Sequence, residues 1–488
     1  MAKSILKVSG KIAKNYFLKG SSYFNAEMPE YFQFEKMLSK IDKKIVGKEY
    51  KTFYKTNKKP DNFIDTSYSI FQEKNSILQW RQLKLLNPFL YVALVNMVTD
   101  KNNWELLKTR YSELTSNGRI KCCSMLDVSV NSKRNNISKW YEDFEQQTIE
   151  LSLKFDYMAI TDISNCYSSI YTHSIAWAIN GKNKAKLNRA DSTLLGNKID
   201  KLIQAMQYGQ TNGIPEGNEM SNFLAEFVLA YIDNELSFSI GNKMVDYRIL
   251  RYRDDIRIFT KEKELLKDIL NKLTIALNSA GLKLNGTKTL ITENILYSAI
   301  KEEKSYYISN PTPFTGNIQN DICALWALNE KYPNSGIVQR RLHDFNKKYK
   351  SKLSKNLRNF SQILAYLVDI VYKAPRLYGI FSSIFTNFKE CYIEKYYDSI
   401  AGKFDNKPYT EYWEVWKQRI QLGRKMKIKN YKSKLCLFVL NRDIEIWNFD
   451  WLNYDIKSCI SDSINATKLN KVTKKISSDI FEIFKKYE

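Results

Sequence analysis

Apolar residues change their spacing along the chain, and these changes predict where helices give way to strands. Between residues 76 and 120 they recur at helical spacing, so we expect helices there. Residues 155–163 are apolar except near their ends and predict a strand. The pattern then predicts two helices, two strands joined by a tight turn, an amphipathic helix and a short strand, over residues 191–210, 219–236, 248–252, 256–259, 261–280 and 282–284. This succession is typical of an α+β fold.

The last third of the chain has a different pattern. Residues 309–316 contain two prolines and a glycine and are the best candidate for a domain boundary. Beyond them the apolar spacing is helical in four stretches, which are residues 321–331, 336–349, 360–372 and 377–392. No strand pattern of comparable strength follows. We therefore expect an all-helical part over residues 309–488.

Composition excludes several classes of protein. With 44% hydrophobic and 14% aromatic residues, the chain is too apolar to be disordered. Its longest apolar run, residues 89–98, is far shorter than the ~20 residues of a membrane helix. The first twenty residues lack the apolar core of a secretory signal. Seven cysteines without a CxxC pair indicate reduced thiols in a cytoplasmic protein, not a disulfide framework or a zinc site.

The net charge of +24 favours a polyanionic partner, with nucleic acid as the first hypothesis. A basic, solvated surface without a partner would explain the charge as well. Only two histidines are present, which leaves little material for a histidine-rich metal site or a Ser-His-Asp triad. Any catalysis must therefore rest on carboxylates, lysines, tyrosines or a metal held by oxygen atoms.

Two adjacent carboxylates stand at the predicted hairpin turn, where residues 251–259 read RYRDDIRIF. Asp254 and Asp255 repel each other unless a cation neutralises them. Mg²⁺ prefers oxygen ligands and accepts substrate phosphates as further ligands. Asp162 stands near the end of the preceding predicted strand and would complete a site for two ions, which can activate a hydroxyl and stabilise a leaving oxygen. Taken alone, an Asp-Asp hairpin turn is as often an ordinary structural turn.

Three further segments occur in a fixed order around this one. They are DISNCY at 162–167, GQTNGIPEG at 209–217 followed by Ser221 and LAE at 224–226, and GLKLN at 281–285 leading to Lys288. Together the four segments resemble the palm motifs of reverse transcriptases. The segments YTHSI at 171–175, QYGQT at 207–211, MPEYF at 28–32 and NPFLYV at 87–92 resemble, more narrowly, the bacterial abortive-infection reverse transcriptases of the AbiK type and related defence enzymes.

This resemblance implies an architecture and a location. We expect fingers and N-terminal helices over residues 1–154, interleaved with a palm over residues 155–308. The all-helical part over residues 309–488 fits the HEAT-like domain of that group by architecture only. The group consists of cytoplasmic bacterial proteins that form homo-oligomers, so we expect a trimer or hexamer and no membrane association.

The resemblance also assigns roles to residues. Asp162, Asp254 and Asp255 would bind two Mg²⁺ ions, with Mn²⁺ as an alternative, and Lys288 would protonate or bind the leaving pyrophosphate. Tyr167 matches the steric gate that excludes a ribose 2′-OH, which implies deoxynucleoside triphosphates as substrates. Pro215 and Gly217 match the turn that approaches the nucleotide, and Arg81 and Lys84 match a finger region that meets the triphosphate. Each basic residue has a surface role as its alternative, and Arg253 departs from the small residue usual at its position.

The AbiK-type enzymes polymerise deoxynucleotides without a template and begin on a tyrosine of their own chain. By position, Tyr16 is the first candidate primer and Tyr23 the second, with ordinary packing as the alternative for both. The single-stranded DNA product would then be attached to the protein. Two other readings stay open, a defence enzyme templated by a bound noncoding RNA and a nucleic-acid-binding assembly protein that uses the palm as a scaffold.

Overall fold

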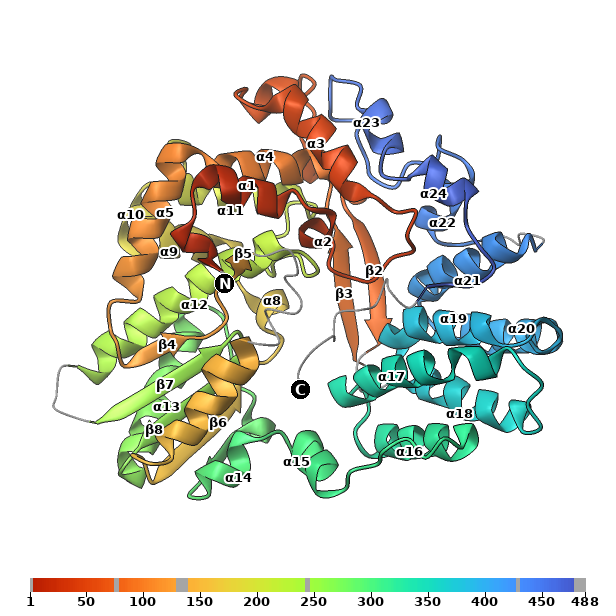
Figure 1. Ribbon diagram of the computed structural model, residues 1–488. Helices are drawn as coiled ribbons and strands as arrows, with labels where there is room; N and C mark the ends of the chain where they lie inside the picture. Colours follow the sequence, from red (N-terminus) through yellow and green to blue (C-terminus); the bar gives the residue numbers. More distant parts are fainter. Residues whose placement is uncertain (1–2, 74–78, 129–138, 242–245, 427–430, 478–488) are drawn as a thin grey trace.

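The computed structural model describes residues 3–73, 79–128, 139–241, 246–426 and 431–477. A central five-stranded sheet lies on one side and a stack of helices on the other (Figure 1). The strand order is β4-β7-β8-β6-β9, with β4 parallel to β7 and all other neighbours antiparallel. The strands are β4 Ile120–Cys122, β6 Tyr157–Asp162, β7 Tyr247–Tyr252, β8 Asp255–Thr260 and β9 Leu290–Thr292.

Helices cover both faces of this sheet. Two long helices, α12 (Glu219–Ile240) and α13 (Lys263–Ser279), pack on one face with Ile256 and Ile258 of β8. The opposite face is covered by the π-helical turn η4 (Trp140–Gln146), α7 (Gln147–Leu151) and α14 (Ile295–Ala299), which close over a smaller apolar cluster. The other helices of this part are α8 Cys166–Ser169, α9 Thr172–Asn180, α10 Lys182–Leu187, α11 Leu195–Ala205 and α15 Glu302–Ser309.

The N-terminal segment holds the residues expected to form the fingers. It contains α1 Gly10–Phe17, α2 Gly20–Tyr23, α3 Phe34–Ile45, α4 Pro88–Thr99 and α5 Lys101–Leu114. Helix α4 begins where Asn87 accepts hydrogen bonds from the backbone of Phe89 and Leu90, with a proline at its first position. Two antiparallel strands, β2 (Tyr68–Glu73) and β3 (Trp80–Leu85), form the finger strand pair. Short elements complete this part: β1 Lys3–Ser4, which pairs with β5 Asp127–Val128, and the 3-10 turns η1 Ile5–Lys7, η2 Tyr50–Phe53 and η3 Pro60–Asn62.

Beyond residue 317 every regular element in the described part of the chain is helical. The helices are α16 Ile318–Lys331, α17 Gly336–Leu353, α18 Phe360–Lys373, α19 Tyr378–Asn387, α20 Glu390–Asp405, α21 Glu411–Arg424, α22 Lys434–Leu440, α23 Lys457–Ser461 and α24 Ala466–Asn470, with the 3-10 turn η6 Pro375–Leu377. Figure 1 shows α16 to α21 stacked side by side. The expected helix over residues 377–392 is divided between α19 and α20, because the chain is extended at Phe388 and Lys389.

The helical part is attached to the fingers through side chains and backbone. Glu73 of β2 pairs with Lys407 at 2.6 Å, and both side chains are nearly buried. The ring of Tyr409 lies 4.5 Å from Phe71 and 4.9 Å from Trp80, centre to centre. The loop between α20 and α21 therefore holds the finger strand pair from the side away from the sheet.

Residues 447–465 return to the N-terminal segment. The indole of Trp447 donates to the carbonyl of Leu85 at 3.0 Å, and the backbone of Asn465 donates to that of Tyr31 at 2.8 Å. Buried apolar residues form one continuous cluster from the fingers through α12 to the helical part. Within the described residues, no helix is both long and apolar enough to cross a membrane.

Two expectations about secondary structure are wrong. The predicted helical stretch over residues 76–120 contains strand β3 before α4 and α5, and residues 76–78 of it lie outside the described part. The predicted strand over residues 282–284 contributes only an isolated bridge between Leu284 and Ile163, and the sheet strand is β9 instead. In both places pairing with another strand decided the structure, since β3 pairs with the preceding β2 and β9 pairs with the distant β6.

Candidate active site

The structure brings Asp162, Asp254 and Asp255 together at one end of the central sheet. Asp162 ends β6 and Asp255 begins β8, and the two are directly opposite in the antiparallel register. Opposed Cα atoms in such a pair lie about 4.5–5.5 Å apart. The backbone of Ile163 donates to the carbonyl of Asp254 at 3.1 Å. The hairpin turn therefore presents both of its carboxylates beside the third.

The turn itself is backbone-strained. Arg253 has φ of +54°, which is uncommon for a residue with a side chain. Its backbone N–H donates to the hydroxyl of Ser124 at 2.8 Å, and this bond helps to hold the conformation. Arg253 lies between Tyr252, the last residue of β7, and Asp254. Its backbone conformation therefore sets the direction in which the chain presents Asp254.

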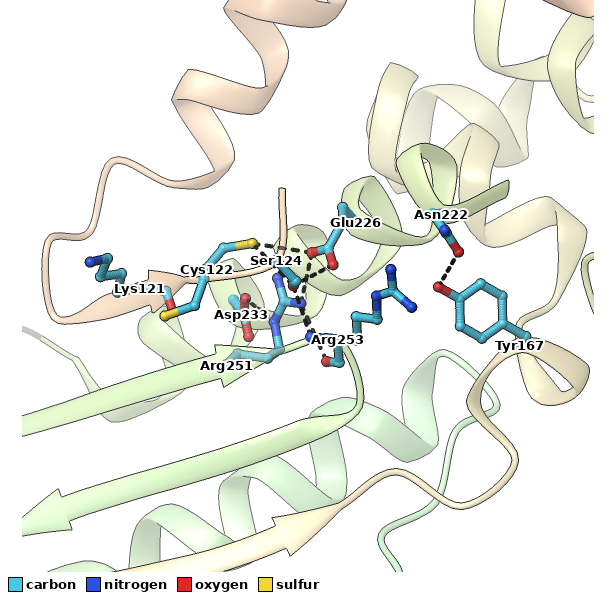
Figure 2. A network of polar contacts seen from close by, with 10 residues as sticks. Lys121, Cys122, Ser124, Tyr167, Asn222, Glu226, Asp233, Arg251 and Arg253 are labelled. Atoms are coloured by element: carbon cyan, nitrogen blue, oxygen red, sulfur yellow. Dashed lines mark hydrogen bonds and ion pairs between the residues drawn. The ribbon is translucent and has the colours of Figure 1, made fainter. Parts of the chain in front are cut away.

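A buried charge network supports the turn from behind (Figure 2). The Arg251 guanidinium donates to Glu226 and Asp233 of α12, each at 2.8 Å. Glu226 also accepts from the hydroxyl of Ser124 at 2.5 Å and from the thiol of Cys122 at 3.2 Å. Burial alone would raise the pKa of Glu226, but Arg251 and these donors hold it below its usual value. The sequence analysis missed this network.

Lys288 lies on the open side of the carboxylates. Its ammonium is 2.6 Å from Oδ2 of Asp162, and its side chain is 66% exposed. The hydrogen bond that Lys288 donates to Asp162, with the charges of all three aspartates, raises the pKa of Lys288. The lysine expected to meet a leaving pyrophosphate is thus placed at the carboxylates and stays positively charged.

Asp255 is an unusual carboxyl group. Burial and the neighbouring Asp254 raise its pKa to about 6, although Lys301 and Arg257 act in the opposite direction. Lys301, Arg257 and Asp255 border a pocket of about 360 Å³ whose apolar wall includes Trp140, Phe144 and Tyr297. Sequence reasoning missed Lys301, which follows α14 and is brought to the site only by the fold.

The residues present fit a divalent cation. Oδ1 of Asp162 is buried and has no hydrogen-bond partner among the described residues, and burial and the charge of Asp254 raise the pKa of Asp255 even with Lys301 and Arg257 nearby. As these side chains stand, no three His, Cys, Asp or Glu residues of the described part form a ready cage, so the carboxylates have to close around an ion. Asp162, Asp254 and Asp255 would hold it, and it would supply Lewis-acid activation of a hydroxyl and of phosphate oxygens.

The expected gate residue lies next to this site. Tyr167 is on the short helix α8, and its hydroxyl donates to Oδ1 of Asn222 at 2.7 Å. Its carbonyl accepts from the backbone of Ile214 at 2.8 Å, which joins α8 to the loop of Pro215 and Gly217. Gly217 has φ of +104°, and a Cβ there would contact Leu83 of β3, so the loop passes close to the fingers.

The finger residues lie on a strand, not on the helix surface considered as their alternative. Arg81 of β3 pairs with the Glu216 carboxylate at 3.1 Å, and the backbone of Lys84 donates to the Glu216 carbonyl at 2.9 Å. The ammonium of Lys84 faces Gln207 at 3.5 Å, and burial lowers its pKa. Arg81 therefore meets the loop that contains Pro215 through its side chain, and Lys84 meets it through its backbone.

The two candidate priming tyrosines are both buried. Tyr16 is 2% exposed, with its ring against Phe17. Tyr23 is fully buried and donates to the carbonyl of Leu86, and burial raises its pKa well above the usual value. A phenol must lose its proton to attack a phosphate, and burial opposes that loss. In this conformation the structure supports the packing alternative for both residues.

Residues 95–315 match the family model described as reverse transcriptase (RNA-dependent DNA polymerase). The chain thus contains a reverse transcriptase domain, and a domain of this kind is a nucleotidyltransferase that polymerises nucleotides. Polymerases of this class bind nucleotides and nucleic acids and generally use divalent metals. No curated protein matches the sequence.

Two solved structures are similar to the chain at low score. A telomerase from Candida albicans, in complex with a fragment of telomeric RNA, is 12% identical with a TM-score of 0.32, over 69% of this chain and 65% of the other. An apo telomerase from Candida tropicalis is 14% identical with a TM-score of 0.33, over 74% and 62%. The chain thus spans less than two thirds of the length of either, and we draw no functional conclusion from these likenesses.

Proposed function

We propose that this protein is a DNA polymerase of the abortive-infection type, which adds deoxynucleotides by two-metal phosphoryl transfer. The observation that carries the chemistry is the position of Asp162 opposite the Asp254–Asp255 turn, with Tyr167 beside it. Mg²⁺ is the proposed ion. The role in antiphage defence, the independence from a template and the start on a tyrosine rest on the resemblance of short sequence segments alone.

The same proposal has three further parts. The domains divide at residues 154/155 and 308/309, the C-terminal helices are HEAT-like, and the protein assembles as a trimer or hexamer. They rest on the resemblance and on the helical content beyond residue 317. Native mass spectrometry of the purified protein measures the assembly directly. A monomer at micromolar concentration would refute the proposed assembly and leave the proposed chemistry intact.

The test of the chemistry supplies Mg²⁺ and labelled deoxynucleoside triphosphates to nuclease-treated protein, without primer or template. We expect label that migrates with the protein on a denaturing gel and is released by protease. Asp254→Asn removes a metal ligand and should lower incorporation by about four orders of magnitude or more. Asp156→Asn is the matched control, because Asp156 is exposed and directly precedes β6, at the end away from Asp162.

Other outcomes select the alternatives. Incorporation that begins only after an RNA template is added, or product whose sequence matches a copurifying RNA, would establish templated synthesis. Salt-dependent binding of single-stranded nucleic acid without any incorporation would favour the scaffold role. Full activity of Asp254→Asn would refute the assignment of the carboxylates.

The structure adds one tyrosine to the search for a primer. Tyr297 is 67% exposed and borders the same pocket as Asp255. Peptide mapping of labelled protein should therefore include Tyr297 beside Tyr16 and Tyr23. If the nucleotide is attached to Tyr16 or Tyr23, the N-terminal helices must leave the core during initiation, and amide exchange in α1 and α2 should be fast in the unmodified protein.

A further inference from the structure

The contacts of Tyr167 go beyond those of a ring that merely fills space. Its main chain is fixed by the loop of residues 209–217, because its carbonyl accepts from Ile214. The far end of the ring is fixed separately, by the hydrogen bond from its hydroxyl to Asn222. Figure 2 shows the two side chains pointing toward each other across the space between α8 and α12, with the Arg253 guanidinium directed toward the hydroxyl end of the ring.

Asn222 can accept this bond because a third residue orients its amide. Nδ2 of Asn222 donates to the Glu219 carboxylate at 3.0 Å, three residues earlier on α12. A carboxylate only accepts hydrogen bonds, so the NH₂ end of the amide must face Glu219 and the oxygen must face Tyr167. Both Asn222 and Glu219 are buried in the first turn of the helix.

The direction of the Tyr167 bond is equally determined. Burial raises the pKa of Tyr167 far above its usual value, despite the opposing charge of Arg253, so the hydroxyl keeps its proton and acts as a donor. Because the Tyr167 hydroxyl can only donate here and the Asn222 oxygen is fixed as the acceptor, this hydrogen bond has a single direction. The ring is therefore held at both ends.

We propose that Asn222, oriented by Glu219, is a positioning residue that fixes the Tyr167 ring and thereby sets the discrimination between deoxyribose and ribose. This inference rests on the proposed function, in which Tyr167 contacts the sugar of the incoming nucleotide. A ring that can tilt leaves room for a 2′-OH, whereas a ring held at its hydroxyl does not. Glu219 and Asn222 touch no substrate in this scheme and act only through Tyr167.

The experiment compares incorporation efficiencies for deoxy- and ribonucleoside triphosphates. Tyr167→Phe removes the hydroxyl and keeps the ring, and Asn222→Leu removes the acceptor and keeps the volume. Each should lower the preference for deoxynucleotides by about fivefold, the effect of one net hydrogen bond, mainly by improving use of the ribonucleotide. The double variant should show the same loss as either single one, since both remove the same bond.

Two controls separate positioning from general damage. Asn234→Ala changes an asparagine further along the same helix and should keep the wild-type preference. Tyr167→Ala removes the ring itself and should lower the preference much further than Tyr167→Phe. Melting temperatures of all variants show whether they are folded, and Tyr167→Phe keeps the test valid if Asn222→Leu does not fold.

The outcomes distinguish this inference from the proposed function. If Tyr167→Phe and Asn222→Leu are active and keep the wild-type preference, the positioning role is wrong and the polymerase remains. Independent, additive losses in the double variant would also overturn it. If the wild-type protein incorporates neither kind of nucleotide under any condition, the proposed function fails, and the sugar preference fails with it.

Discussion

Arg251 joins the strand before the Asp254–Asp255 turn to helix α12. It is almost fully buried and bonded to two carboxylates of α12, so it fixes β7 to the helix directly behind the aspartates. A buried ion pair contributes little compared with a well-packed apolar substitute, but a buried charge without its partner costs much. The same ion pairs that position the Asp254–Asp255 turn therefore also contribute to the free energy of unfolding.

Replacing Arg251 with Met should leave Glu226 and Asp233 buried and unpaired. We expect a loss of about 3–5 kcal/mol in the free energy of unfolding, measured by urea titration. Arg248→Met, on the same strand but partly exposed, is the control and should cost far less. Equal losses in the two variants would show that the network is not structurally important.

Binding of Mg²⁺ to the three aspartates should stabilise the fold. At a free Mg²⁺ concentration one hundred times the dissociation constant, the gain is about 2.7 kcal/mol, seen as a higher melting temperature. Asp162→Asn should abolish this gain, since it removes the carboxylate whose Oδ1 lacks a partner in the described part of the chain. The same gain in Asp162→Asn as in wild type would place the ion elsewhere.

Among the elements, the finger strand pair is contacted on two sides by segments that are far apart in sequence. One side of it meets the loop of Pro215 and Gly217 through Arg81 and Lys84. The other side meets the helical part through Lys407 and Tyr409. The strands are thus held between the loop of Pro215 and Gly217 and a segment more than three hundred residues away in sequence.

Tyr409→Ala should loosen the finger strand pair without touching the carboxylates. Each of its two ring contacts contributes about 0.5–1.5 kcal/mol, so amide exchange in the described residues of β2 and β3 should speed up by about tenfold or more. The measurement is hydrogen exchange with mass spectrometry. Phe238→Ala, which removes an exposed ring of α12, should leave these amides unchanged.

Local patterns predicted the elements whose sequence decides their structure. Apolar spacing predicted the hairpin of β7 and β8 and the helices α12 and α13. The order of the motifs predicted that Asp162 lies near the turn. Strand β3 was mistaken for helix because its structure depends on β2, and its residues alone have helical spacing. The roles of Asn222, Glu226 and Lys301 were missed, because they arise only from contacts with Tyr167 of α8, Arg251 of β7 and Asp255 of β8 that the fold creates.

At the scale of the whole molecule, the chain closes on itself. Residues 447–465 lie along the N-terminal segment, with Trp447, Trp451 and Leu452 packed against it. The sequence predicted a boundary at residues 309–316 and nothing of this return. The helical part and the fingers therefore share buried surface, and they should lose structure together.

Trp447→Ala tests this shared stability. Removing a fully buried indole should cost about 3–5 kcal/mol, and limited proteolysis should then cut both the fingers and the helical part faster. Trp177→Ala, at a partly exposed position, is the control. Faster cutting confined to the helical part would mean that the two parts unfold independently.

The attachment of the finger strand pair to the α20–α21 loop has a genetic consequence. Any change in the packing of these distant helices is transmitted to the strands that face the nucleotide loop. Mutations that alter the speed or accuracy of synthesis should therefore be recovered around residues 407–410 as well as near the aspartates. A selection for altered activity would then map a second cluster far from the chemistry, and natural variation in that loop would tune the enzyme while leaving its catalytic residues untouched.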